Sequence, residues 1–308
     1  MLDRVGTLSI SQGLITEYGR IQSRTVKLQT QISSGKVGDN LADVKDKASV
    51  LVAAKQRVAG VESLLAATKE VSTRLDLQDL HLQKLTDITT RLRNSVGDAI
   101  STGRSGAFME EVRGLYAEAV GVLNERMGGN YLYGGTRTDV APVSATDLAA
   151  LAAAPSVASV LRNTDQVMTV NIDQSETLTV GVTASDVATD LLQMFKDIAD
   201  FNQGPSGPLS SMLTPAQTAF LTNANVQIPS IQSGIAEHAA LNGTRYEQVQ
   251  RAIERHEAMS AYFAKFISDI EDVDLAEAVA RLNRDQVAAE ASGRMIAQLS
   301  ETNLLKFL

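Results

Sequence analysis

The sequence predicts a mainly α fold in which the N- and C-terminal helices pair as a long antiparallel coiled-coil-like rod, with a small β-containing outer domain inserted in the middle. Hydrophobic residues make up 44% of the 308 residues, yet aromatic residues reach only 4% and Trp is absent. The apolar material is therefore mostly Ala, Leu, Val and Ile, which favours long helices that meet along narrow seams. Apolar residues also recur at heptad spacing near both ends, whereas the middle is rich in turn-forming residues.

Three heptad runs occupy the N-terminal part of the chain. The first steps by four and three from Leu14 to Ile32 and ends at the turn-forming stretch SSGKVGDN. The second extends from Val61 to Ala99. A shorter run over residues 108–122 follows STGRSG, and we expect it to fold back along the second.

The C-terminal part holds an unbroken heptad run from Ile235 to Ile270, followed by a slip in register. The slip falls in DIEDVDLAE, where Asp274 can cap a new helix and Glu277 occupies its third position, as in a capping box. We therefore expect a new helix to start at about Leu275.

Heptad seams need partners, and the two ends of the chain mirror each other. The simplest pairing joins the first helix to the last one and the second helix to the one next to last. Three domains follow from this pairing: 1–35 with 272–308 as an inner terminal coiled-coil domain, 36–130 with 230–271 as a helical rod domain, and 131–229 as an outer mixed α/β domain.

The middle of the chain differs in kind. Apolar residues alternate on both sides of a turn within 168–182, which predicts a hairpin with a half-buried face. A helix is expected to follow from a cap at Ser185 or Asp186, and the next one from Thr214 as cap with Pro215 in its first turn. Pro229 should interrupt or bend that returning helix.

The candidate functional residues are apolar seam positions together with the apolar chain end, LSETNLLKFL. In a single molecule these side chains have little core to enter, and fully burying a Leu or Phe contributes about 1.5 to 3 kcal/mol. We therefore expect neighbouring copies to complete their burial. The intersubunit and coiled-coil seam is predicted at Leu14, Tyr18, Ile21, Leu28, Ile32, Leu275, Val279, Leu282, Ile296, Leu304, Leu305, Phe307 and Leu308.

The charge distribution excludes some classes of partner. The net charge is −8, and residues 141–240 hold nine acids but two bases, whereas the flanks hold 27 acids and 26 bases. Nucleic acid is an unlikely partner because phosphate neutralisation needs a basic face. No stretch has the roughly 18 to 20 apolar residues of a membrane span, and the N-terminus does not read as a signal peptide.

We find no motif that predicts catalysis, a cofactor or a metal. Cys is absent, and the three histidines are scattered. His256 falls at a heptad core position, where a hydrogen-bonded seam histidine is favoured over a pH sensor; Gln78, Gln286 and Asn242 are interpreted in the same way. The paired glycines of MGGNYLYGG lack the rest of a phosphate loop and indicate a hinge or turn.

Four features together resemble the flagellin family: the paired terminal heptads, the SSGK break near residue 35, the acidic DVDLAE start of the last helix and the apolar final residue. The stretches GGNYLYGGTRTDVAPV and ISDIEDVDLAEAVARLNRDQ are more similar to hook–filament junction members of the family than to filament subunits. The resemblance covers roughly residues 1–140 and 230–308.

This resemblance implies a non-enzymatic structural subunit of the bacterial flagellum, without a cofactor, that forms the junction between hook and filament and acts as the platform for flagellin assembly. It implies export through the flagellar type III channel without a cleaved signal peptide. The implied partners are copies of the chain in a ring, the first hook-associated protein, flagellin and a cytoplasmic export chaperone.

Three alternatives remain open on the sequence. The chain could be flagellin itself, the filament subunit. It could be a soluble helical ligand-binding protein, although the seam positions offer mostly Leu, Val, Ile and Ala and few converging polar groups. A membrane-surface protein is disfavoured because the polar helix faces carry mixed charge without an excess of Lys and Arg.

Overall fold

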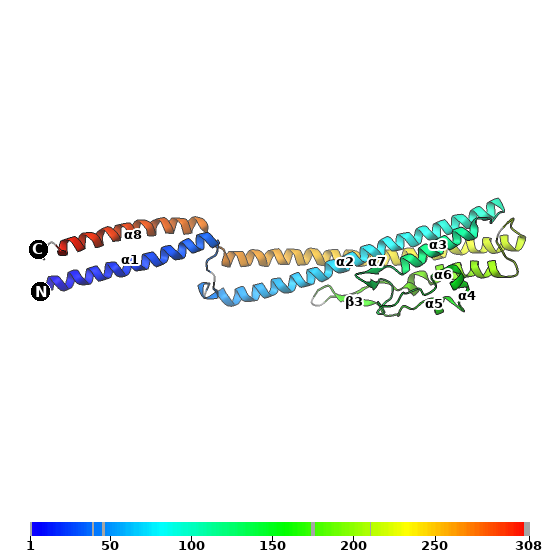
Figure 1. Cartoon of the computed structure of the whole chain (residues 1–308), viewed down its shortest axis with the longest axis horizontal. Coiled ribbons are helices and arrows are strands. Elements are labelled where there is room, and N and C mark those ends of the chain that lie inside the picture. The colour runs from blue at the N-terminus through cyan, green and yellow to red at the C-terminus, as the bar shows by residue number, and fades with distance from the viewer. Residues whose placement is uncertain (1, 39, 45–46, 174–175, 210, 305–308) are drawn as a thin grey trace. The chain divides into compact units, whose positions relative to one another are not determined.

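The computed structural model describes residues 2–38, 40–44, 47–173, 176–209 and 211–304. It divides into two compact units. One, the terminal unit, comprises the chain up to Val61 and from Ala258 onward; the other, the central unit, comprises Glu62–Glu257. The mainly α fold with β structure confined to the middle of the chain is confirmed (Figure 1).

In the terminal unit, the first and last helices lie side by side and antiparallel (Figure 1). These are α1, Leu2–Ser34, and α8, Leu275–Leu304. The predicted pairing of the first helix with the last is thus confirmed. Each heptad seam supplies one face of this pair.

The breaks that bound α1 and α8 are bonded to each other within the terminal unit. Helix α1 ends at Gly35, whose φ of +72° lies in the left-handed region that glycine tolerates. The amide of Val37 donates to the carbonyl oxygen of Glu271 (2.7 Å), and the amide of Val273 donates to that of Gly35 (2.9 Å). A short 3-10 helix, η1, Leu41–Asp43, then leads toward α2.

The predicted start of the last helix is also confirmed. The amide of Glu277 donates to Oδ1 of Asp274 (3.1 Å), which makes Asp274 the N-cap of α8. The carboxylate of Glu277 bonds Arg281, four residues further on. Of the two hydrogen bonds of a capping box, the structure therefore shows the one from the Glu277 amide to the Asp274 side chain.

The central unit contains the greater part of two long antiparallel helices, α2, Ala48–Thr102, and α7, Pro215–Glu271. The side-chain amide of Asn242 donates to the carbonyl oxygen of Leu75 (2.9 Å), and that of Gln250 donates to Oγ of Ser72 (2.9 Å). The pairing of the second helix with the next to last is therefore confirmed, and so is the interpretation of Asn242 as a polar seam residue.

Helix α3, Phe108–Leu123, folds back along α2 as predicted. Oγ of Ser95 donates to Glu111 (2.7 Å), and Arg91 pairs with Glu118 (2.8 Å). These contacts flank a core of fully buried apolar side chains that α6, Ala184–Gln203, completes. This core includes Leu82, Leu85, Leu92, Leu115, Tyr116, Phe195 and Leu221.

The inserted segment contains two hairpins. Strands β1, Arg126–Met127, and β2, Asn130–Tyr131, flank a turn in which Gly128 and Gly129 both have positive φ, so the turn predicted from the glycine pair is confirmed. The short helices α4, Leu148–Ala153, and α5, Val157–Val160, were not predicted.

The second hairpin confirms the predicted alternation. Strands β3, Met168–Asn171, and β4, Thr177–Val180, are antiparallel, with Val170 opposite Leu178. Its apolar face packs on the α2–α7 seam through buried Ile172, Leu178 and Val180.

Two helix starts show the value of local caps. The cap of α6 is Thr183, instead of the predicted Ser185 or Asp186, because Thr183 and Asp186 form a reciprocal capping box. The amide of Asp186 donates to Oγ1 of Thr183 (3.2 Å), and the amide of Thr183 donates to Asp186 (3.0 Å). Helix α7 begins at Pro215 as predicted, with Thr214 and Gln217 bonding each other in the same way.

The sequence predicted that Pro229 would interrupt or bend this helix. Helix α7 continues through Pro229, so the predicted interruption is wrong. A proline inside a helix removes one backbone hydrogen bond and clashes with the preceding turn. Here the neighbouring Ile228 and Ile231 are buried in the core on either side of it. Burial of two isoleucines contributes about 3 to 6 kcal/mol, enough to keep the helix continuous.

Candidate assembly surface

The α1–α8 pair carries the predicted seam residues. Ile21 of α1 and Ala278 of α8 are buried, at 4% and 3% exposure. Other side chains are half-buried, among them Leu14, Tyr18, Leu28, Ile32, Leu282 and Ile296. The two helices therefore pack against each other along one narrow line of side chains.

Several large apolar side chains of the same helices remain exposed. The described members are Ile15 (57%), Val26 (62%), Leu275 (51%), Val279 (43%), Val287 (68%) and Met295 (47%). We call this set the terminal apolar face. The core of the central unit, by contrast, is almost completely buried.

Two predicted seam positions, Leu275 and Val279, belong to the terminal apolar face instead of the seam with α1. The seam of α8 follows buried and half-buried residues in heptad steps: Ala278, Leu282, Asp285, Ala289, Ser292, Ile296 and Leu299. The predicted positions share Leu282 and Ile296 with this seam. The exposed apolar side chains of α8 therefore lie outside the line of residues that α1 covers.

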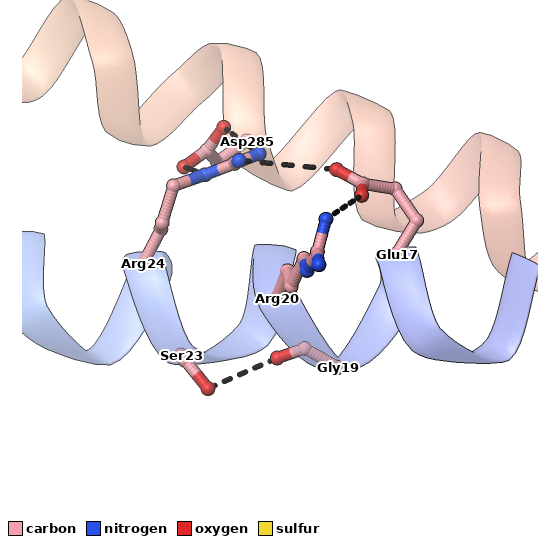
Figure 2. Close-up of polar contacts among 6 residues, drawn as sticks. All are labelled: Glu17, Gly19, Arg20, Ser23, Arg24 and Asp285. Carbon is pink, nitrogen blue, oxygen red and sulfur yellow. Dashed lines mark hydrogen bonds and ion pairs between the residues drawn. The ribbon is translucent and has the colours of Figure 1, made fainter. Parts of the chain in front are cut away.

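An ion pair joins the two helices (Figure 2). Nε and Nη2 of Arg24 donate to the two carboxylate oxygens of Asp285 at 3.2 and 3.3 Å. Arg24 also lies 3.8 Å from Glu17, which pairs with Arg20 at 3.7 Å. The Asp285 side chain is 17% exposed and that of Arg24 is 54% exposed. Such pairs contribute about 0 to 1 kcal/mol, so the contact sets the register of the helices more than their stability.

Sequence reasoning missed this ion pair although a signal was present. Asp285 lies three residues after Leu282, at a heptad position for which the apolar pattern favoured Gln286 instead. Gln286 is exposed, and its interpretation as a seam residue is therefore wrong for this helix pair. Asp285 is the polar residue that fixes register here.

A cavity of about 340 Å³ lies beside this ion pair, lined by Arg24, Lys27, Leu28, Gln31, Arg281, Arg284 and Asp285. Three of its cations already have carboxylate partners: Arg24 pairs with Asp285, Lys27 with Asp43, and Arg281 with Glu277. Lys27 also lowers the pKa of Asp43 through its hydrogen bond and its charge. Two of these ion pairs link α1 to α8 and to η1.

The apolar chain end lies at the edge of the described structure. Leu304 is the last residue of α8, and its side chain is not described. Leu305, Phe307 and Leu308 lie outside the described residues. Their predicted role in assembly stays a prediction.

The remaining expectations concern His256, metal binding and membrane-spanning helices. Nε2 of His256 donates to the carbonyl oxygen of Ile172 (2.7 Å), which confirms a hydrogen-bonded seam histidine. Across the described residues, no group of three or more His, Asp or Glu side chains could hold a metal ion. In the same part of the chain, no helix is both long and apolar enough to span a membrane.

The comparisons with known proteins point in one direction. Residues 222–308 match the model of the bacterial flagellin C-terminal helical region. A solved structure from Vibrio parahaemolyticus, assigned as a flagellar hook-associated protein, matches with a TM-score of 0.60 and 16% identity, over 75% of this chain and 100% of that one. FlgL of Bacillus cereus matches with a TM-score of 0.55 and 11% identity, over 71% of this chain and 98% of that one. No curated protein sequence gave a significant match.

The class is thus a helical protein with a flagellin-type C-terminal region, and the resemblance to the flagellin family is confirmed for residues 222–308. More particularly, the fold is the one found in the hook-associated protein of Vibrio parahaemolyticus and in FlgL of Bacillus cereus.

Proposed function

We propose that this chain is a structural subunit of the bacterial flagellum that forms the junction between hook and filament and acts as the platform for flagellin assembly. The observation that carries the proposal is the terminal apolar face on a flagellin-type helix pair. A helix pair that buries one line of apolar side chains and leaves other large apolar side chains exposed needs further partners to cover them.

The energetics favour assembly through the chain ends. Each of the six exposed side chains of the terminal apolar face would contribute up to about 1.5 to 3 kcal/mol when fully buried. Neighbouring copies with the same surface are the simplest partners that could bury these side chains. The mixed charge of the helix pair, with most described cations locally paired, permits such close approach of copies.

The fold neighbours support the junction over the filament, because one is assigned as a hook-associated protein and the other is FlgL. The role is structural and non-enzymatic, in the extracellular flagellum. The partners are further copies in a ring, the first hook-associated protein and flagellin. Export proceeds through the flagellar type III channel, with a cytoplasmic chaperone on the C-terminal region.

Electron microscopy of isolated flagella that carry a tagged copy tests the proposal. We expect label confined to a band at the distal end of the hook, and loss of filaments when the gene is deleted. Label along the whole filament would instead favour the alternative, flagellin. Polymerisation of the purified protein into long fibres on filament seeds would favour the same alternative.

A further inference from the structure

A cluster of buried polar side chains lies within the central unit, away from the assembly surface. It comprises Arg74, Gln78 and His81 on α2, together with Tyr133 after β2, and we call it the polar cluster. Gln78 and Tyr133 are 0% exposed and His81 is 3% exposed. Arg74 is half-buried.

Two of the four side chains approach Gly181 of the inserted segment, and the other two lie close to each other. A Cβ at Gly181 would lie 3.4 Å from Nε2 of Gln78 and 3.9 Å from Nη2 of Arg74. The rings of His81 and Tyr133 have centroids 5.9 Å apart. The cluster is therefore contiguous between α2 and the backbone near Gly181.

Most of the polar atoms in the cluster are not bonded to protein. Among the described residues, none accepts from or donates to Nε of Arg74, either amide atom of Gln78, Nδ1 of His81 or Oη of Tyr133. Buried polar atoms in native proteins are nearly always hydrogen-bonded. Four of these five atoms lie within two turns of α2, and the fifth belongs to Tyr133. Hydrogen bonds to them therefore require partners small enough to enter the buried cluster.

The donors and acceptors identify the chemistry of that partner. Arg74 Nε–H and the Gln78 amide N–H groups need an acceptor, whereas Oε1 of Gln78 needs a donor. An anion would leave Oε1 of Gln78 without a hydrogen-bond donor, and a cation would be repelled by the positive charge of Arg74. Water both donates and accepts, and internal waters typically bridge about three such groups.

We propose that the polar cluster holds ordered internal water, which joins α2 to the inserted segment. Direct hydrogen bonds frame this site. Nη2 of Arg74 donates to the carbonyl oxygen of Leu132 (2.9 Å), and the amide of Ala184 donates to that of Tyr133 (3.0 Å). The hydrated site thus lies where the beginning of the inserted segment and the start of α6 meet the long helix.

A helix on the opposite side completes the frame. Nη1 of Arg245, on α7, donates to the carbonyl oxygen of Gly181 (3.1 Å). Both long helices therefore hold the inserted segment by arginine-to-carbonyl bonds, α2 at Leu132 and α7 at Gly181. Water between these bonds satisfies the remaining polar atoms, and it fixes one orientation of the segment on α2.

A high-resolution crystal structure of the full-length protein tests the proposal directly. Crystals grown with bromide in place of chloride distinguish water from an anion by anomalous scattering. We expect non-anomalous density within hydrogen-bond distance of the Gln78 amide and Oη of Tyr133. A bromide signal at this position, or a cluster that contains no density, would overturn the proposal.

Oxygen-17 relaxation dispersion provides a second test in solution by counting long-lived internal waters. Gln78→Met and Tyr133→Phe should each reduce the count by at least one relative to the wild type. Tyr116→Phe is the matched control, because Oη of Tyr116 bonds the carbonyl oxygen of Ala145 directly (2.7 Å). An unchanged count in folded Gln78→Met and Tyr133→Phe proteins would contradict the site. Neither test depends on the flagellar role.

Discussion

Arg24 of α1 and Asp285 of α8 form a two-point contact across the terminal helix pair, at 3.2 and 3.3 Å. Because Asp285 occupies a seam position while Arg24 flanks the seam, this contact is available in one register of the two helices. A shift of either helix by one heptad would bring Glu17 or Gln31, instead of Arg24, opposite the carboxylate. Asp285 thus specifies the alignment that the apolar seam alone leaves open.

The first prediction concerns that contact. Asp285→Arg places two cations together, and we expect faster amide hydrogen exchange in α1 and α8. The double variant Arg24→Asp, Asp285→Arg should restore most of the protection, because it exchanges the two charges. The change should be small, about 1 kcal/mol or less, as for other exposed pairs.

The control for this experiment is Glu110→Arg. Glu110 pairs with Arg113 on α3 in the central unit, so its reversal should leave exchange in α1 and α8 unchanged. If the double variant were as weakly protected as Asp285→Arg alone, the pair would have no role in alignment.

The second prediction concerns the terminal apolar face. Val279→Asp and Val287→Asp should leave the isolated chain folded, with the unfolding free energy changed by less than about 0.5 kcal/mol, because both side chains are exposed. Assembly should nevertheless be lost, since a neighbouring copy would have to bury a carboxylate. Thermal unfolding measures the first effect, and swimming in soft agar measures the second.

Leu80→Asp is a matched control, because Leu80 is 47% exposed on α2 and lies outside the terminal unit. We expect this variant to swim. Normal swimming by the Val279→Asp and Val287→Asp strains would show that this face stays in solvent in the flagellum.

The long helices were predictable because their signals are repeated many times. Each heptad run contains many positions that predict the same helix face. The two breaks carry signals of their own, because Gly35 tolerates a positive φ and Asp274 is an N-cap residue. Single residues decide the features that were missed. Thr183, instead of Ser185, caps α6 through a reciprocal pair of hydrogen bonds with Asp186, which the residue types alone did not distinguish.

The register of α8 was the harder problem. An apolar pattern favours Leu275 and Val279, whereas the packed seam uses Ala278, Asp285 and Ser292. Small side chains at Ala278 and Ser292 allow α1 to approach closely, and several larger apolar side chains of α8 remain exposed outside the seam. Which of these side chains a partner covers depends on the partner, and a single sequence does not contain the neighbouring copies.

The third prediction concerns the apolar chain end. Removal of residues 304–308 should leave the central unit folded, because its core lies within Glu62–Glu257. Incorporation at the hook tip should be lost, since up to four large apolar side chains no longer contribute to assembly. Immunoblots of secreted protein distinguish a failure of export from a failure of assembly. Swimming by the truncated strain would require another role for this end.

The fourth prediction is a pH dependence that arises from His81 in the polar cluster. Burial lowers the pKa of His81, and the charge of Lys84 lowers it further, whereas Glu125 opposes the shift. The unfolded chain, with a histidine pKa of about 6.5, therefore binds a proton at a higher pH than the folded chain does. The stability is fully present above about pH 6.5 and declines as the pH falls toward the lowered folded-state pKa.

Urea titrations at pH 7.5, 6.5 and 5.5 measure this effect in the central unit of the full-length protein. The wild type should lose stability between pH 6.5 and 5.5, by up to about 1.4 kcal/mol per pH unit for one proton. His81→Gln keeps a polar side chain but cannot titrate, so its stability should vary less over this range. His238 and His256 remain in both proteins, and the difference between the two curves therefore isolates His81. Parallel curves would mean that His81 accepts its proton equally well in the folded and unfolded chains, and that its buried position next to Tyr133 does not hinder protonation.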